Sequence, residues 1–207
     1  MKKQFCFSSL LLCVLLFAAC GAQGDPLPPP SDPPYQIIFF DPAELTEFFD
    51  ARDLSDEELQ TFLTEKNYSM NGVRSREELN ALCEQFTAKP LPTVKDAVWT
   101  DITIYVETST VHIRYERQTG EVYSFTYSLL DTLEEQDAAL GISEALPKAS
   151  LIPTASSLFQ VYQFPTKEDD VAVYVLSSPE LWLSLRLFHA GPDDITTLLD
   201  ITLEPVQ

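Results

Sequence analysis

Residues 101–130 read DITIYVETSTVHIRYERQTGEVYSFTYSLL, and this stretch decides the fold. Apolar and polar residues alternate through three successive runs, which a strand turns into two opposite faces. Short polar connections near residues 108–109 and 118–120 separate the runs. The stretch therefore predicts an antiparallel three-stranded meander with one solvated face. Its apolar positions are Ile102, Ile104 and Val106, then Val111, Ile113 and Tyr115, then Tyr123, Phe125, Tyr127 and Leu129.

The chain after the meander predicts one helix and a second group of strands. Asp131 with Glu134 predicts a capped helix over about 131–140, which Gly141 ends. Residues 143–157 contain two prolines and read as a loop. Alternating apolar patterns predict strands near 159–164, 171–176, 181–187 and 195–203. The strand at 171–176 is apolar on both faces and is expected to be central.

The chain before the meander predicts one strand and three short helices. Residues 35–40, YQIIFF, are rich in β-branched and aromatic side chains, which is typical of a buried strand. Helices are predicted over 42–52, 55–66 and 75–87, because each has an apolar stripe of helical period behind a capping residue. The capping pairs are Asp41 with Glu44, Ser55 with Glu58, and Ser75 with Glu78.

These patterns predict a single α+β domain over residues 35–207. Residues 35–92 form its mostly helical part and residues 93–207 its mostly β part. The N-terminal helices are expected to pack on a mainly antiparallel sheet of about seven strands. The alternative fold is a β-sandwich with a helical N-terminal cap.

The first 34 residues have the pattern of a targeting segment and a spacer. Lys2 and Lys3 precede a run, residues 5–19, that is apolar except for two serines and too short to span a bilayer comfortably. The run ends in FAACG, which resembles the lipobox of bacterial lipoproteins. The resemblance implies cleavage after Ala19 and lipidation of Cys20, so that residues 1–19 are a signal peptide and the mature chain is anchored outside a bacterial membrane. Residues 20–34 contain six prolines and predict a semi-rigid linker that reaches roughly 40 Å.

The charge balance excludes some partners. The chain has 13 basic and 32 acidic residues, a net charge of −19. Loss of Lys2 and Lys3 with the signal peptide leaves 11 basic residues against 32, or −21. Such a field repels nucleic acid, and no nucleic-acid partner is expected. The negative charge is expected to serve mainly for solubility outside the cell.

Motifs for known chemistry are missing from the sequence. Two histidines, His112 and His189, with no HExxH or CxxC, do not make a zinc site, and both histidines are expected to be ordinary sheet residues. There is no GxSxG nucleophile motif. Cys83, the one cysteine after Cys20, lies on an apolar helix stripe and is expected to be an inert core residue. No glycine-rich phosphate loop indicates a nucleotide, so no cofactor, metal or catalytic residue is predicted.

Acidic and aromatic residues leave two alternatives open. The acidic turns at 168–170 and 193–194 lack EF-hand spacing and read as solvated turns. A carboxylate pair of the glycosidase type depends on spacing in three dimensions, which sequence does not give. Aromatic residues in the strands serve either as core, which is the favoured interpretation, or as a binding platform. They are Trp99, Tyr105, Tyr115, Tyr123, Tyr127, Trp182 and Phe188.

These observations favour a membrane-anchored extracytoplasmic lipoprotein with a non-catalytic binding or envelope-interaction domain. Its partner is expected to be a protein, a peptide or a glycan. The alternative is an extracytoplasmic hydrolase that uses carboxylates on glycans or peptides. A purely structural accessory subunit is the third hypothesis.

Overall fold

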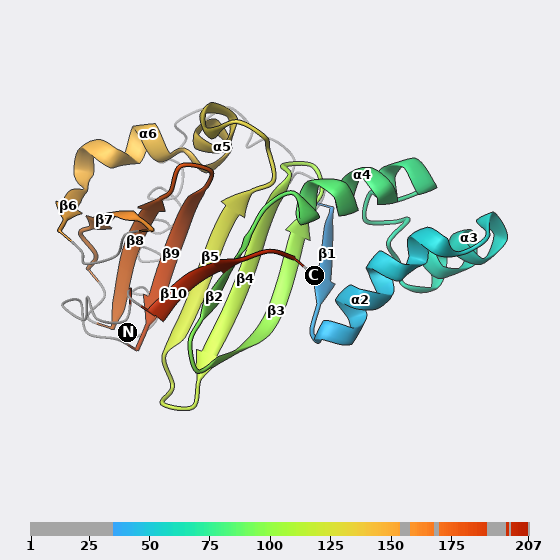
Figure 1. The fold of residues 1–207 in the computed structure, drawn as a ribbon, viewed down its shortest axis with the longest axis horizontal. Coiled ribbons are helices and arrows are strands. Elements are labelled where there is room, and N and C mark those ends of the chain that lie inside the picture. Colours follow the sequence, from blue (N-terminus) through green and yellow to red (C-terminus); the bar gives the residue numbers. More distant parts are fainter. Residues whose placement is uncertain (1–34, 154–157, 168–169, 190–197, 199, 207) are drawn as a thin grey trace, which may run out of the picture. The chain divides into compact units, whose positions relative to one another are not determined.

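Eight strands form one antiparallel sheet in the computed structural model, which describes residues 35–153, 158–167, 170–189, 198 and 200–206. The strand order is β1-β3-β4-β5-β9-β8-β7-β6 (Figure 1). The described residues belong to one unit, residues 34–207. The strands of this large sheet are β1 (Gln36–Phe39), β3 (Ala97–Tyr105), β4 (Thr110–Arg117), β5 (Val122–Ser128), β6 (Ser150–Ile152), β7 (Gln160–Phe164), β8 (Val171–Ser177) and β9 (Trp182–Phe188).

The predicted meander is confirmed as β3, β4 and β5. Ile113 on β4 lies opposite Ile102 on β3 and Phe125 on β5, so the apolar positions of all three strands share one face. Strand β9 then pairs with β5, with Leu185 opposite Phe125, and this pairing joins the two groups of strands into one sheet. Strand β8 lies between β9 and β7, as its two apolar faces predict.

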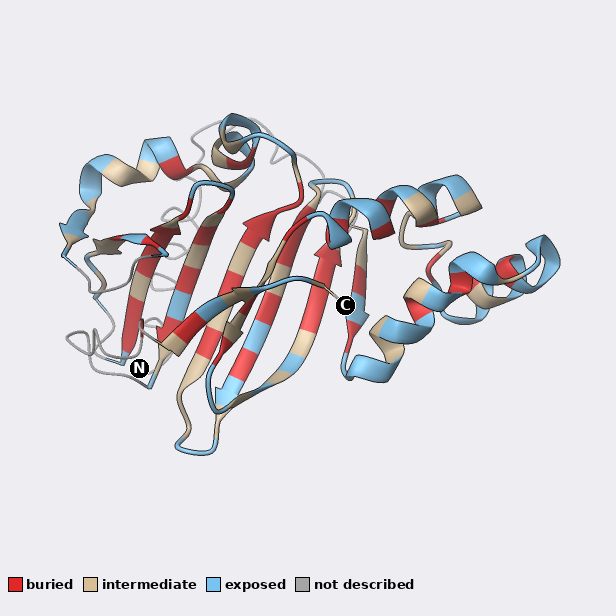
Figure 2. Cartoon of the chain, viewed as in Figure 1, coloured by how far each residue is buried: buried red, intermediate tan, exposed pale blue. Residues whose placement is uncertain are grey.

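The apolar face of the large sheet forms the core. Buried and more accessible residues alternate along β4, β5 and β9, as Figure 2 shows. Tyr123, Phe125 and Tyr127 are fully buried, as are Leu183 and Leu185 on β9. Burial of side chains of this size contributes about 1.5–3 kcal/mol each, which is the main stabilising term of such a sheet.

A small second sheet lies across the apolar face (Figure 1). Its two strands are β2 (Leu91–Val94) and β10 (Ile201–Glu204), which pair antiparallel. The Tyr115 hydroxyl on β4 donates to the carbonyl oxygen of Pro92 at 2.8 Å and links the two sheets. Strand β2 is not among the predicted strands, because its segment contains Pro90 and Pro92, and it forms because β10 supplies a partner that is distant in sequence.

The three predicted N-terminal helices are confirmed as α2 (Pro42–Asp50), α3 (Asp56–Glu65) and α4 (Arg76–Thr87), with a short 3-10 helix η1 (Ala51–Asp53) after α2. Complete capping boxes begin α3 at Ser55 and α4 at Ser75. Asp41 caps α2, but the Glu44 carboxylate accepts from the Phe40 N–H instead of closing the box. Packing of Phe48 against Phe39 at 5.4 Å, ring centre to ring centre, joins these helices to β1.

The connection between the two groups of strands differs from the prediction. The N-cap of helix α5 (Leu133–Leu140) lies one residue later than expected, because Thr132 with Glu135, and not Asp131 with Glu134, forms the capping box. Gly141 ends the helix in the left-handed conformation, as predicted. The loop expected at 143–157 instead holds α6 (Ile142–Ala145), a 3-10 helix η2 (Leu146–Lys148) and β6.

The α+β prediction, with short helices and a mainly antiparallel sheet, is confirmed. The second sheet has two strands among the described residues, so the alternative of a β-sandwich does not apply. Of the last predicted strand, residues 195–197 and 199 lie outside the described residues, as do Cys20, the signal peptide and the linker. No helix in the described ranges is long and apolar enough to span a membrane.

Candidate functional site

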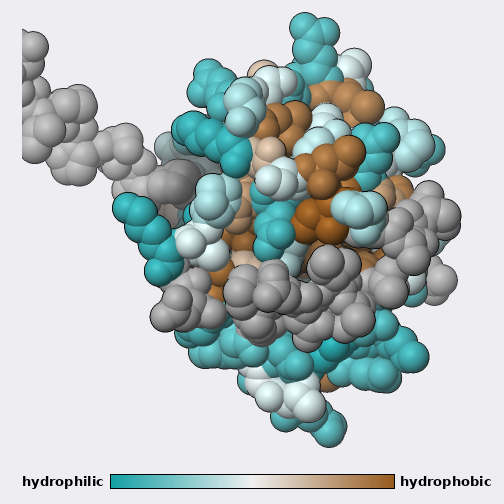
Figure 3. Space-filling model, turned by 90° about the vertical axis from the view of Figure 1, so that its left-hand side faces the viewer, coloured by the Kyte–Doolittle hydropathy of each residue, from teal (hydrophilic) through white to brown (hydrophobic). Residues whose placement is uncertain are grey.

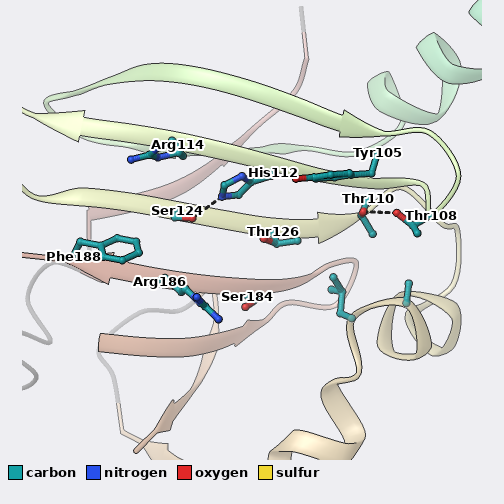
Figure 4. Close-up of a pocket in the computed structure, with 12 residues that line it drawn as sticks. Tyr105, Thr108, Thr110, His112, Arg114, Ser124, Thr126, Ser184, Arg186 and Phe188 are labelled. Carbon is teal, nitrogen blue, oxygen red and sulfur yellow. Dashed lines mark hydrogen bonds between the residues drawn. The ribbon is translucent and has the colours of Figure 1, made fainter. Parts of the chain in front are cut away.

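A polar depression of about 750 Å³ lies on the face of the large sheet opposite the core. Strands β4, β5 and β9 form its floor, and the last residues of α5, Ala139 and Leu140, line one end. Figure 4 shows Arg114 and His112 on one strand, Ser124 and Thr126 on the next, and Arg186 and Ser184 on the third. Their side chains share one face because they occupy the polar positions of the alternating pattern.

Two arginines, Arg114 and Arg186, flank the depression. In the register of the sheet, Arg114 lies opposite Ser124, and Ser124 lies opposite Arg186. Neither arginine forms an ion pair within 4.0 Å with any described residue, and no carboxylate lines the depression. The acid opposite Arg114 in the register, Asp101, is half-buried and accepts a hydrogen bond from the Thr100 hydroxyl at 3.1 Å.

His112 and Ser124 form a hydrogen bond between the two arginines. The Nε2 atom of His112 lies 2.6 Å from Ser124 Oγ, and the tautomer of the ring decides which atom donates. Burial lowers the pKa of His112, and the nearby Arg114 and Arg186 lower it further, whereas Asp101 opposes the shift. Burial therefore disfavours the protonated imidazole, and the positive charge of the site comes from the guanidinium groups.

The side chains that line the depression offer hydrogen-bond donors to an anion. The strand N–H groups are used in the sheet ladder, so a ligand meets guanidinium groups and hydroxyls such as Ser124, Thr126 and Ser184 instead of backbone donors. Guanidinium groups bind carboxylates and phosphates with strong, directional hydrogen bonds. The described part of the chain contains no group of three or more His, Cys, Asp or Glu placed to hold a metal ion.

The aromatic residues divide between core and site. Tyr115, Tyr123 and Tyr127 are buried, as the favoured interpretation predicts. Tyr105 and Phe188 line the polar depression, and Trp99 lines a separate hollow of about 570 Å³ beside the C-terminal residues. The alternation in sequence separates the buried tyrosines from the aromatic residues that line the depression, because the buried tyrosines occupy the same alternate positions as the aliphatic residues of their strands.

The histidines and Cys83 have different surroundings. His112 lies on the polar face as predicted, but it is half-buried and hydrogen-bonded, which an ordinary surface histidine is not. His189 directly follows β9 in an exposed position, with Nδ1 3.7 Å from the Asp170 carboxylate. Of the two acidic turns, Asp170 alone is described. Cys83 is fully buried in the core, as predicted, and burial raises the pKa of its thiol to about 11.

Two smaller hollows each contain two carboxylates. Asp96 and Asp200 share one of about 600 Å³, and Asp131 and Glu180 share one of about 360 Å³. Asp96, Asp131 and Glu180 are exposed, and Asp200 is paired with Arg117 at 2.7 Å. A carboxylate general acid needs a desolvated carboxyl group, and neither hollow provides one among its described residues. The hydrolase alternative therefore gains no support from these hollows.

The fold and site define an α+β protein whose large antiparallel sheet carries an open, arginine-flanked face. Comparisons with protein-family models, with curated proteins and with solved structures find no match. The site must therefore be interpreted from its own residues. Sequence reasoning missed Arg114 and Arg186 because they are 72 positions apart, and their only common signal is that each occupies a polar position of a strand pattern.

Proposed function

We propose that this chain is an extracytoplasmic lipoprotein, anchored through Cys20, whose domain binds an anionic ligand on the open face of the large sheet and does no chemistry on it. The observation that carries the binding role is the pair Arg114 and Arg186, which flank one depression with no ion-pair partner among the described residues. The tether and its location follow from the resemblance of residues 17–21 to a lipobox and from the proline-rich linker.

The strongly negative net charge makes the unpaired arginines significant. The chain has 32 acidic residues for 13 basic ones, and Arg76 and Arg117 are each paired with a carboxylate. Arg52 and Arg74 also form no ion pair within 4.0 Å among the described residues, but Arg114 and Arg186 differ from them because both line one depression. Screening at physiological salt limits distant charges to a range of about 8 Å, so the nearest charges, the two guanidinium groups and the Asp101 carboxylate beside Arg114, determine the potential inside the depression.

The chemistry of the site favours binding over catalysis. His112 and the Ser124 hydroxyl form a hydrogen bond, but a regular strand offers no spare backbone N–H groups to stabilise an oxyanion. The carboxylate or phosphate group of the ligand is held between the guanidinium groups, with Ser124 as a further donor. Hydrogen bonds to charged groups contribute about 1.5–3 kcal/mol each, which suits a reversible interaction.

Titration with inorganic phosphate, followed by NMR of the amide and arginine side-chain signals, tests the binding role. We expect saturable shifts at Arg114, Ser124 and Arg186. Arg114→Gln and Arg186→Gln should each weaken binding about tenfold, as expected for the loss of ~1.4 kcal/mol. The matched control is Arg52→Gln, which removes one positive charge from η1, away from the lining residues of the depression. Equal weakening in the control variant, or shifts spread over the whole surface, would contradict the proposal.

The anchor needs its own experiment. Cys20→Ala should abolish incorporation of a radiolabelled or clickable fatty acid and release the chain from the membrane fraction, because two acyl chains provide the stable attachment. Cys83→Ala is the matched control, because it removes a cysteine that is buried in the core. If the Cys20→Ala variant stays in the membrane fraction, the lipoprotein proposal is wrong.

A further inference from the structure

The open face of the large sheet changes from cationic to apolar at one strand boundary. One row across the strands runs from Arg114 on β4 through Ser124 on β5 to Arg186 on β9. The same row continues with Val173 on β8 and Phe164 on β7. Neighbouring strands lie about 4.8 Å apart, so the two arginine backbones are separated by roughly 10 Å and the apolar residues follow directly.

A second row repeats this change. His112 lies opposite Thr126, and Thr126 lies opposite Ser184 on β9. Beyond Ser184 the row continues with Val175 on β8 and Tyr162 on β7. The boundary between β9 and β8 therefore separates a polar half of the face from an apolar half in both rows.

The apolar half is accessible at several positions. Val173, Tyr162 and Phe164 are half-buried, and Leu151 on the edge strand β6, opposite Tyr162, is 64% exposed, whereas Val171 and Val175 on β8 are buried. Figure 3 shows apolar side chains gathered among hydrophilic ones on the side of the molecule that carries β6 to β8. Phe188 connects the halves, because it lines the depression and lies opposite Val171 on β8.

We infer that the ligand is a small amphipathic anion that lies across the strands. This inference rests on the proposed function and deepens it. The carboxylate or phosphate group lies between Arg114 and Arg186, and an acyl chain or aromatic ring attached to it lies over Phe188, Val173 and Phe164. Charge complementarity places the anionic group of the ligand at the arginines, and the order of the strands places its apolar group over β8 and β7. A purely inorganic anion uses the first half of the face only, whereas an amphipathic anion also removes apolar surface from water on β8 and β7.

A series of straight-chain carboxylates from acetate to octanoate, kept below the concentration at which micelles form, tests the inference by calorimetry and NMR. We expect affinity to rise with chain length, by up to about fourfold for each methylene group that is fully buried. Octanoate should bind at least tenfold more tightly than acetate, with shifts that extend from Arg186 to Val173 and Phe164.

Variants separate the two halves of the face. Val173→Ser combined with Phe164→Ser should bring octanoate binding close to that of acetate and leave acetate binding unchanged. Arg114→Gln should weaken both ligands. Val98→Ser is the matched control, because Val98 is 70% exposed and lies on the first strand beyond the arginines in the opposite direction. Circular dichroism of each variant checks that the sheet is intact.

The outcomes distinguish the two proposals. If acetate and phosphate bind but octanoate binds no more tightly, the amphipathic ligand is wrong and anion binding stands. If no anion binds at the arginines, both proposals fail. Loss of the octanoate preference in Val98→Ser would also overturn the inference, because it would place the tail on the wrong side of the arginines.

Discussion

The Nε2 atom of His112 lies 2.6 Å from the Oγ atom of Ser124, across the boundary between β4 and β5 and between two arginines that have no ion-pair partner among the described residues. This relationship fixes the imidazole in the floor of the depression. It also makes the protonation state of His112 depend on the two arginines, since a proton on the imidazole adds a third positive charge beside theirs.

The first prediction concerns the pH dependence of stability through His112. Burial lowers its pKa in the folded state below the ordinary value of 6.5, so the folded protein binds fewer protons at this position than the unfolded chain. The contribution of the unprotonated His112 to the free energy of unfolding is fully present above pH 6.5 and is lost as the pH falls through the folded-state pKa. Thermal unfolding of the wild-type protein and of His112→Gln between pH 7.5 and 5 measures this difference. We expect the wild-type midpoint to fall relative to the variant.

The comparison with His112→Gln is necessary because many carboxylates titrate below pH 5 in both proteins. Their effect cancels in the difference between the two midpoints, whereas the effect of His112 remains. If the unfolding midpoints of the wild type and of His112→Gln change in parallel from pH 7.5 to 5, protonation of His112 does not affect the stability of the folded state.

The second prediction concerns the link between the two sheets. Tyr115→Phe removes the 2.8 Å hydrogen bond to the Pro92 carbonyl and leaves a buried acceptor without that donor, which should cost about 1–2 kcal/mol in the free energy of unfolding. Denaturant unfolding measures the loss. Tyr162→Phe is the control, because that tyrosine is half-buried and its hydroxyl contacts Gln160 near the edge of the sheet. Equal losses in both variants would contradict the role of the link.

The raised pKa of Tyr115 predicts a loss of stability at alkaline pH. Burial raises the pKa of Tyr115 to about 12, with Glu204 adding to the shift, so the unfolded chain ionises first. The stabilising contribution of the neutral hydroxyl is present below pH 10 and is lost as the pH rises from 10 towards 12. Unfolding midpoints in this range should fall more steeply for the wild-type protein than for Tyr115→Phe.

The third prediction concerns Gln136, which attaches α5 to the ends of β5 and β9. Its side chain is fully buried, donates to the carbonyl oxygens of Leu130 and Glu180, and accepts from the Trp182 N–H. Gln136→Leu keeps much of the volume but leaves three backbone groups without this partner, and we expect a loss of about 2–5 kcal/mol.

Gln85→Leu on the exposed face of α4 is the control for that substitution. It should change the free energy of unfolding by less than about 0.5 kcal/mol. Because α5 also lines the anion depression, chemical shifts of Ala139 and Leu140 report whether the wall of the depression moves in Gln136→Leu. A Gln136→Leu protein as stable as the wild type would show that the three bonds do not hold α5.

The fourth prediction concerns Cys83. Its side chain is fully buried and burial raises its thiol pKa to about 11, so very little thiolate exists at pH 8 and reagents cannot reach it. We expect alkylation of the peptide that contains Cys83, followed by mass spectrometry, to be at least a hundredfold slower in the folded protein than in guanidinium chloride. Rapid labelling of the folded protein would instead indicate a reactive thiol.

Local patterns made much of the fold predictable. The alternation in residues 101–130 determines which side chains face the core, and the capping boxes at Ser55 and Ser75 determine where two helices begin. These features depend on neighbours within a few residues, so the sequence contains the information directly. The cap of α5 was wrong by one residue because Asp131 and Thr132 both have the required partner three positions later.

Short strands could not be predicted in the same way. Strand β2 overlaps a proline-rich segment, and β6 has three residues within a segment that reads as a loop. Strand β2 exists because β10, which is distant in sequence, supplies hydrogen bonds to it, and β6 exists because it pairs with β7, the next strand in the chain. Intrinsic preferences in so short a segment are weaker than this tertiary contribution.

The sequence by itself determined that His112, Arg114, Ser124 and Arg186 lie on polar strand faces, because the period of two is a local property of the chain. Only the tertiary structure decided that these faces coincide. The pairing of β5 with β9 brings Arg186 beside Ser124 across 62 positions of sequence, and it places the apolar strands β8 and β7 directly beyond. The register of such a pairing is set by how the apolar faces of both strands fit one common core, and no stretch of sequence contains that information alone.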